Sequence, residues 1–238
     1  GGCLSCLDIV SVLYQEILNI KPNKPKSPNR DRFILSKGHT GAVVFATLAN
    51  KGFFPKSWLD TFCENESKIP GHIDSHGILG VELSTGSLGH GLSVGVGMAM
   101  SLRDRAIKAH VFIILSDGEM NAGGTWEAMT FTSHHKLNNI IAIVDKNKIQ
   151  SFGRTKDVID LDPLGEKWKS FGWKVYEIDG HNHKKLGETF LKAKKSRTKP
   201  VVIICNTIKG KGLEGREDQL ISHYRPPTDE DIKKVMEE

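Results

Sequence analysis

Two polar residues stand where predicted buried strands end. Asp117 follows the apolar run 111–115, and Asn147 follows the apolar run 140–144, with room for one crossover helix between them. Because the carboxyl ends of parallel strands form one ligand-binding edge, we expect the two side chains to meet there. A carboxylate, an amide oxygen and a main-chain oxygen suit octahedral Mg²⁺ that phosphate oxygens complete. The pattern indicates a metal–diphosphate site, while a turn at Asp117-Gly118 with Asn147 capping another turn is the structural alternative.

Histidines in irregular segments are a second source of chemistry. His39, His72, His90 and His223 occur in polar or glycine-rich stretches, where imidazoles recognise hydroxyl groups and transfer protons. Any one of them taken singly is better explained by a surface or structural role, and none has zinc spacing. The glycine-rich stretch 86–97 lacks the preceding strand and the later acidic residue of a dinucleotide fingerprint. We expect a loop that leads into a packed helix and lets the backbone approach a ligand.

Apolar periodicity predicts the elements that must position these groups. Helical spacing occurs in residues 4–18, 42–50, 124–135, 164–171 and 183–195, and a last helix begins at Thr228 and caps the domain. Short apolar runs predict strands at 32–36, 111–115, 140–144, 174–178 and 201–205. Strands without polar alternation, separated by helices, predict an α/β fold in three layers, a central parallel sheet covered by helices on both faces. Without a linker or an internal repeat, we expect one domain over residues 1–238.

Composition excludes several classes of protein. The net charge of +5 comes from 33 basic and 28 acidic residues that are dispersed along the chain, so we expect no nucleic-acid partner. No apolar run approaches the ~20 residues of a membrane helix, and no secretory signal is expected. Cys3 and Cys6 form a C-x-x-C pattern without a second pair, which favours packing over chemistry. The four cysteines fit a reducing, cytoplasmic compartment.

The motifs as a set resemble those of thiamine diphosphate (ThDP) enzymes, and transketolases most closely. The metal motif is Ser116-Asp117-Gly118-Glu119 with the later Asp145-Lys146-Asn147-Lys148-Ile149. The blocks that match transketolase occur in the family's order and are Ser36-Lys37-Gly38-His39, Pro70-Gly71-His72, Gly80-Val81-Glu82-Leu83-Ser84-Thr85-Gly86-Ser87-Leu88-Gly89-His90-Gly91 and Ser222-His223. The resemblance runs nearly end to end and corresponds to the family's first, diphosphate-binding domain. It implies the N-terminal subunit of a split transketolase.

The resemblance assigns roles to individual residues. Asp117, the side-chain oxygen of Asn147 and the main-chain oxygen of Ile149 would bind Mg²⁺. The cofactor would contact Gly118 and the backbone of Gly86, Ser87 and Leu88, with His39 and His223 near its diphosphate and thiazolium. His39, His72 and His223 would face the sugar hydroxyls, with His223 transferring a proton.

The implied reaction moves a two-carbon ketol unit from a ketose, usually a phosphate, to an aldose, with ThDP as electron sink. The family's activating glutamate belongs to a later domain. We therefore expect this chain to be active only with a separate C-terminal subunit, in the α2β2 assembly that the family implies. The alternatives are a 1-deoxyxylulose-5-phosphate synthase, the alpha subunit of a 2-oxo-acid dehydrogenase, or a non-catalytic scaffold or regulatory subunit that keeps the fold.

Some positions depart from the family pattern. Family members place a histidine just before the Gly-Gly with which this sequence opens. Ala122 replaces a glutamate of the carboxylate network that links paired active sites, while Glu127 is kept. Ser116 stands in place of the first glycine of the metal motif, and His90 stands where many members have glutamine.

Overall fold

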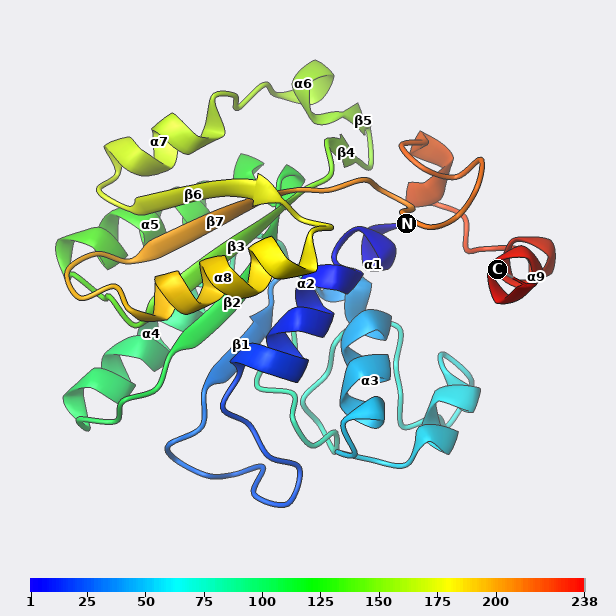
Figure 1. Ribbon diagram of the computed structural model, residues 1–238, viewed down its shortest axis with the longest axis horizontal. Coiled ribbons are helices and arrows are strands. Elements are labelled where there is room, and N and C mark those ends of the chain that lie inside the picture. The colour runs from blue at the N-terminus through cyan, green and yellow to red at the C-terminus, as the bar shows by residue number, and fades with distance from the viewer. Residues whose placement is uncertain (238) are drawn as a thin grey trace.

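A computed structural model describes residues 1–237. Its centre is a parallel sheet in the order β1-β2-β3-β7-β6 (Figure 1). The strands are β1 (Arg32–Leu35), β2 (Val111–Ser116), β3 (Ile140–Lys146), β7 (Val201–Asn206) and β6 (Lys174–Asp179). The three central strands are buried almost throughout, as expected for parallel strands covered on both faces. The predicted strands are confirmed, each to within two residues of its predicted end.

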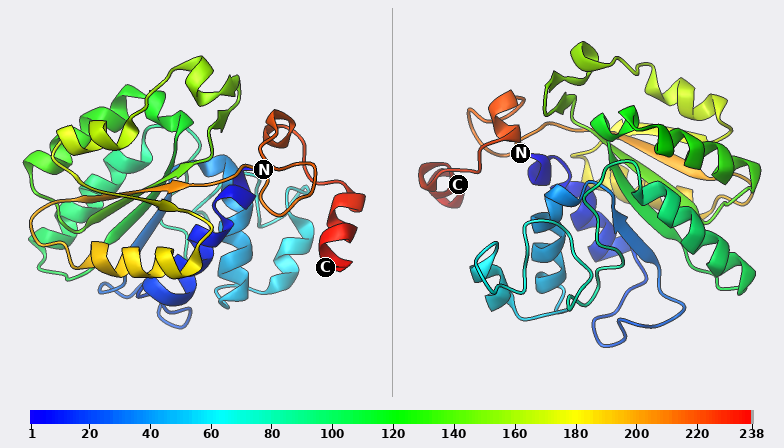
Figure 2. Two further views of the ribbon diagram at one scale, coloured as in Figure 1. Left: turned by 45° about the horizontal axis from the view of Figure 1, so that its top comes forward. Right: turned by 180° about the vertical axis from the view of Figure 1, so that it is seen from behind.

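Helices cover both faces of the sheet and complete the three-layer α/β fold (Figures 1 and 2). One face packs on α2 (Leu7–Val12), α3 (Gly41–Asn50) and α8 (His183–Lys194). The other packs on α4 (Gly91–Asp104), α5 (Gly123–His134) and α7 (Leu164–Ser170). Successive strand residues alternate between the two cores, so Ile113 faces one and Ile114 the other, which is the period-2 geometry of a strand.

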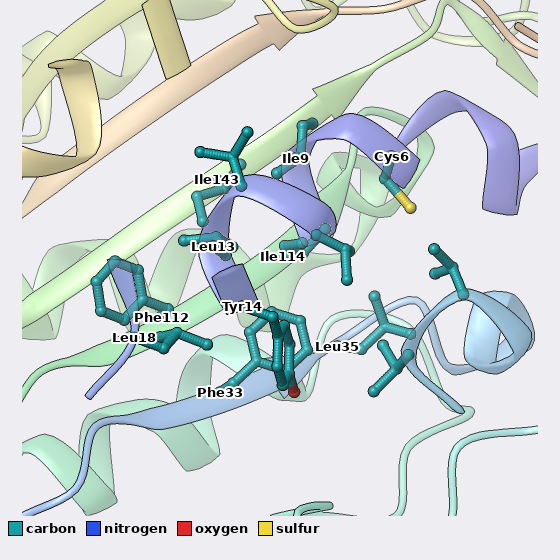
Figure 3. Packing of buried hydrophobic residues seen from close by; sticks show 14 of the residues in the cluster. Cys6, Ile9, Leu13, Tyr14, Leu18, Phe33, Leu35, Phe112, Ile114 and Ile143 are labelled. Carbon is teal, nitrogen blue, oxygen red and sulfur yellow. The ribbon is translucent and has the colours of Figure 1, made fainter. Parts of the chain in front are cut away.

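The N-terminal helix predicted over residues 4–18 is broken into three pieces. Its parts are α1 (Gly2–Ser5), α2 and a wide π turn (Leu13–Ile17). The Ser5 hydroxyl donates to Asp145 Oδ2 at 2.5 Å and also lies 3.0 Å from the carbonyl of Gly2, so the side chain competes with continuous helix. The apolar spacing still identifies the buried face, because Ile9, Leu13 and their neighbours pack on the sheet (Figure 3).

Irregular chain and short elements surround the sheet. Residues 63–90 contain no helix or strand, and they follow a 3₁₀ turn (Lys56–Thr61). Beyond β3 lie the short pair β4 (Ile149–Gln150) and β5 (Gly153–Arg154), then α6 (Thr155–Val158). Elements this short leave no periodic pattern in the sequence, and they were not predicted.

The last helix, α9 (Asp229–Glu237), buries no residue and lies away from the sheet (Figure 1). The prediction that it caps the domain is therefore wrong, because its side chains face no core. It is tied to the preceding loop by an ion pair of 3.1 Å between Arg216 and Asp231. Among residues 1–237, no helix has the length and apolar character needed to cross a membrane.

Candidate functional site

The carboxyl ends of β2, β3 and β7 open into a cavity of about 480 Å³. The sheet register places Ser116 opposite Asp145 and Lys146 opposite Asn206, so the residues that follow these strands converge. The cavity is lined by Gly2, Lys37, His39, Leu88, Ser116, Asp117, Gly118, Asn121, Asn147, Ile149, Gln150, Ser151, Phe152, Val158, Ile159, Lys209 and His223. This is the ligand-binding edge expected of an open parallel sheet.

Asp117 is a buried carboxylate held by the backbone. Its Oδ1 accepts from the amide of Gly118 at 2.8 Å, and its Oδ2 accepts from the amide of Lys148 at 2.5 Å. Burial, and then the negative charge of Asp145, raise its pKa to about 6 despite these hydrogen bonds. A nearby cation would favour the charged form of such a carboxylate.

Asn147 and Ile149 present two more oxygens beside Asp117. The Asn147 amide nitrogen lies 3.3 Å from Ser5 Oγ and 3.4 Å from Asp145 Oδ2. Its Oδ1 accepts from the amide of Ile149 at 3.1 Å. Because both nitrogen contacts are acceptors, the amide is oriented with its oxygen away from the buried carboxylate.

A fully buried ion pair lies beneath these oxygens. The ammonium of Lys37 donates to Asp145 Oδ2 and to the carbonyl of Gly2. Asp145 also accepts from the hydroxyls of Ser5 and Thr207. Burial is the largest single influence on both groups and opposes their charges. The charge of the partner and the hydrogen bonds together outweigh burial, which raises the pKa of Lys37 and lowers that of Asp145. The network ties the N-terminal turn to the ends of β3 and β7.

Lys209 and two histidines bring further charge and proton chemistry. Lys209 Nζ donates to the carbonyl of Ile149 at 2.8 Å and to Nδ1 of His223 at 2.9 Å. Burial and the charge of Lys37 lower the pKa of Lys209 to about 8. Burial and Lys209 lower the pKa of His223 to about 4. The His39 ring lies 6.3 Å from that of His223, and desolvation and Lys37 lower its pKa to about 4.

A family model described as transketolase, thiamine diphosphate binding domain, matches residues 1–238. The chain belongs to the transketolase family. A 6-deoxy-6-sulfo-D-fructose transketolase subunit from a Clostridium species is 40% identical over the whole chain, which covers 86% of that protein. An apulose-4-phosphate transketolase subunit from Actinobacillus succinogenes is 39% identical, again over the whole chain and 86% of the relative.

Solved transketolases share the fold of this chain. The structure from Campylobacter jejuni superposes with a TM-score of 0.92 at 32% identity. The match covers 100% of this chain and 38% of that one. The present transketolase-family chain thus corresponds to somewhat over a third of that longer transketolase.

The residues of this transketolase-family site fit a Mg²⁺-bound diphosphate. A carboxylate, an amide oxygen and a carbonyl are the hard donors that Mg²⁺ takes, with several positions left for phosphate and water. Lys209 lines the same cavity and supplies positive charge for an anion. Within residues 1–237, no group of three or more His, Cys, Asp or Glu side chains is placed to hold a metal.

The cavity contains most of the residues predicted from sequence, but not all. His39, Leu88, Asp117, Gly118, Asn147, Ile149 and His223 line it. His72, Gly86 and Ser87 are not part of the lining. His72 lies beside Gly86 and is close enough to His39 to contribute to the lowering of that pKa. The three lie in the irregular stretch 63–90, whose path periodicity does not predict.

Several residues that line the cavity were not predicted as site residues, among them Lys37, Asn121, Gln150 and Lys209. Lys209 had a usable signal, because it follows the strand 201–205 at the same sheet edge as Asp117 and Asn147. Asn121 and Gln150 pair at 3.1 Å beside Gly118. No sequence pattern predicts these two residues, since a strand of only two residues positions Gln150.

The C-x-x-C pattern is a packing feature, as predicted. Cys6 is fully buried in the core, and burial raises its pKa to about 12. Cys3 is partly buried and packs against the same core. A thiol with a raised pKa is a poor nucleophile and metal ligand, because both roles need the thiolate.

The unusual Ala122 lies against the glycine-rich loop. A Cβ on Gly89, which has a φ of +87°, would come within 2.6 Å of the Ala122 side chain. The neighbouring Glu119 is buried and accepts from the amide of Gly89 at 2.8 Å and from the hydroxyl of Ser36. Burial raises the pKa of Glu119. One buried carboxylate therefore remains at this loop, while Glu127 is exposed on α5.

Proposed function

We propose that this chain is the ThDP-binding, N-terminal subunit of a two-subunit transketolase. It would transfer a two-carbon ketol unit from a ketose donor to an aldose acceptor together with a separate C-terminal subunit. The observation that supports this most is the convergence of Asp117, Asn147, Ile149 and Lys209 on one cavity. Three hard oxygens beside a buried ammonium suit a magnesium-bound diphosphate.

Each residue has a place in this proposal. Asp117 Oδ, Asn147 Oδ1 and the Ile149 carbonyl would hold Mg²⁺, and Lys209 would turn from the Ile149 carbonyl to the diphosphate. The cofactor would contact His39, Gly118 and Leu88, together with Gly86 and Ser87 from the irregular stretch. ThDP, when bound, supplies the electron sink that lets a carbon–carbon bond beside a carbonyl break.

The histidines would bind hydroxyl groups and transfer protons as neutral rings rather than act as cations. Because the Lys209 ammonium donates to Nδ1 of His223, the neutral ring carries its proton on Nε2. That N–H can donate to a sugar oxygen, and release of the Lys209 contact would free Nδ1 to accept a proton. His39 and His72 would bind neighbouring hydroxyls, with His72 outside the present cavity lining.

The partner and the sugar are proposed from the same comparison. The relatives named as transketolase subunits match this chain over most of their length, whereas the longer transketolase matches over 38%. A C-terminal subunit would supply the remaining domains, in an α2β2 assembly. The relatives' names include a sulfonated and a phosphorylated sugar, so we propose a ketose with a terminal anionic group as the donor.

The test is a coupled assay of ketol transfer with the chain and its partner, supplied with ThDP and Mg²⁺. Ketose phosphates or sulfonates as donors should give turnover, and the chain alone should give none. Turnover with pyruvate instead would favour a 1-deoxyxylulose-5-phosphate synthase or a 2-oxo-acid dehydrogenase. Partner-dependent turnover that Asp117→Ala leaves unchanged would rule out this metal site and favour a scaffold role.

A further inference from the structure

A second polar cluster consists of Asp8, His181 and His183 and contains none of the residues assigned above. Asp8 on α2 bridges two histidines, with its Oδ2 at 2.7 Å from Nδ1 of His181 and its Oδ1 at 2.6 Å from Nε2 of His183. His181 stands between β6 and α8, and 13% of its side chain is exposed. On its other side, Nε2 of His181 lies 2.9 Å from the backbone nitrogen of Ile208.

The two contacts of His181 fix its tautomer. The Ile208 backbone N–H can only donate a hydrogen bond, so Nε2 of His181 must be the acceptor. Nδ1 then carries the ring proton and donates it to Asp8. Asp8 therefore holds the imidazole in the one neutral form that accepts from Ile208, a role that carboxylates commonly play for functional histidines.

Ile208 precedes Lys209 in the short segment that places Lys209 at the cavity. Thr207 before it is anchored through its hydroxyl to Asp145 and through its amide to the carbonyl of Lys146. Lys209 after it is held by its carbonyl, which accepts from the amide of Asp218 at 2.9 Å. The His181 contact fixes the peptide between these two anchors, and so sets the direction in which the Lys209 side chain leaves the backbone.

We propose that His181, oriented by Asp8, is a positioning residue for the anion-binding Lys209. The proposal rests on the proposed function, because it assigns Lys209 to a diphosphate. Loss of the Nε2 acceptor leaves the Ile208 N–H without its partner and lets the peptide turn, which moves the ammonium away from the anion. A residue that accepts at the same point should preserve binding even though it is not histidine.

Two variants test the contacts of the two imidazole nitrogens separately. In His181→Gln, the side-chain oxygen reaches the position of Nε2 and accepts from Ile208. In His181→Asn, the shorter amide reaches the position of Nδ1 and keeps the contact with Asp8 but not that with Ile208. His183→Asn is the matched control, because His183 contacts the other oxygen of Asp8 and its side chain is 59% exposed.

The probe is inorganic pyrophosphate with Mg²⁺. It is titrated calorimetrically into the full chain, together with any partner protein that co-purifies. The Tm of each variant is recorded as well. We expect His181→Asn to weaken binding by about ten-fold, the effect of one unsatisfied buried donor, with Gln and the His183 control within about three-fold of wild type. Equal affinities for the Asn and Gln variants, or a loss that follows Tm, would overturn the positioning role and leave the proposed function standing. Failure of the wild-type chain to bind pyrophosphate would overturn both.

Discussion

Lys209 and His223 share a hydrogen bond of 2.9 Å between the lysine ammonium and Nδ1 of the imidazole. The same ammonium also donates to the carbonyl of Ile149, one of the three oxygens proposed to bind Mg²⁺. One side chain thus contacts both the metal-ligand group and the proton-transfer group of the proposed site. The charge and the direction of this lysine therefore affect both the metal-ligand group and the histidine of the cavity.

Replacing Lys209 with methionine removes the charge while keeping most of the side-chain volume. A charged hydrogen bond to a partly buried anion contributes about 1.5–3 kcal/mol, so the affinity for Mg²⁺-pyrophosphate should fall by roughly ten- to a hundred-fold. Calorimetric titration measures the loss. Lys211→Met is the matched control on the same loop, because Lys211 pairs with Glu217 at 3.1 Å and is 40% exposed. An equal loss in both variants would show that the effect is nonspecific.

The histidine rings of the site should stay neutral in mildly acidic solution. Because its pKa is lowered to about 4, His223 should titrate well below a solvent-exposed histidine in NMR spectra of the Cε1–H protons, with assignment by His223→Gln. The unfolded chain takes up this proton near pH 6.5, so acidification from about pH 6.5 toward pH 4 should weaken the folded state. A His223 resonance with an ordinary histidine pKa would contradict this prediction.

Asp117 should destabilise the metal-free chain at neutral pH. Its pKa is raised to about 6 in the folded chain. The protonated carboxyl therefore stabilises the folded chain fully below the unfolded-state pKa near 3.8, and this stabilisation is lost as pH rises through about 6. Relative to wild type, Asp117→Asn should therefore gain stability by roughly 2 kcal/mol between about pH 4 and pH 7.5, while it loses Mg²⁺ binding. Urea unfolding without metal at the two pH values measures this difference, and a difference independent of pH would contradict it.

The buried pair of Lys37 and Asp145 should be sensitive to loss of one partner. Lys37→Met leaves an unpaired buried carboxylate, which should cost about 3–5 kcal/mol in the free energy of unfolding. Adding Asp145→Asn should recover part of that loss. Lys146→Met is a control, because Lys146 pairs with Asp162, whose side chain is 56% exposed, and such pairs contribute under about 1 kcal/mol. Similar losses in the two single lysine variants would argue against a special role for the buried pair.

Strand and helix positions were predictable because the sheet is buried on both faces. Runs such as 111–115 and 201–205 have no polar alternation, which is typical of covered parallel strands. The break at Cys6 and the π turn at Leu13–Ile17 were not predictable, because both depend on tertiary contacts. The side chain of Ser5, the last residue of α1, contacts Asp145, which is far away in the sequence.

The site was predictable where it follows from strand ends and not where it depends on loops. Asp117 and Asn147 come together because neighbouring parallel strands end at one edge, a relationship that sequence order alone reveals. His72, Gly86 and Ser87 belong to an irregular stretch whose course is set by packing, so a motif match does not place them. The contact of His181 with Ile208 joins two strand ends through one backbone amide and leaves no mark in the sequence pattern.

The most direct test is a native mass spectrum of the complex purified gently from cells that produce this protein. We predict a mass that contains this chain, a second subunit of roughly 300 residues, bounded by ordinary domain sizes, and ThDP with Mg²⁺. The Asp117→Ala variant should keep the second subunit and lose the cofactor mass. A species that contains this chain without ThDP, even after ThDP and Mg²⁺ are added, would contradict the proposal that this chain binds the cofactor of a two-subunit transketolase.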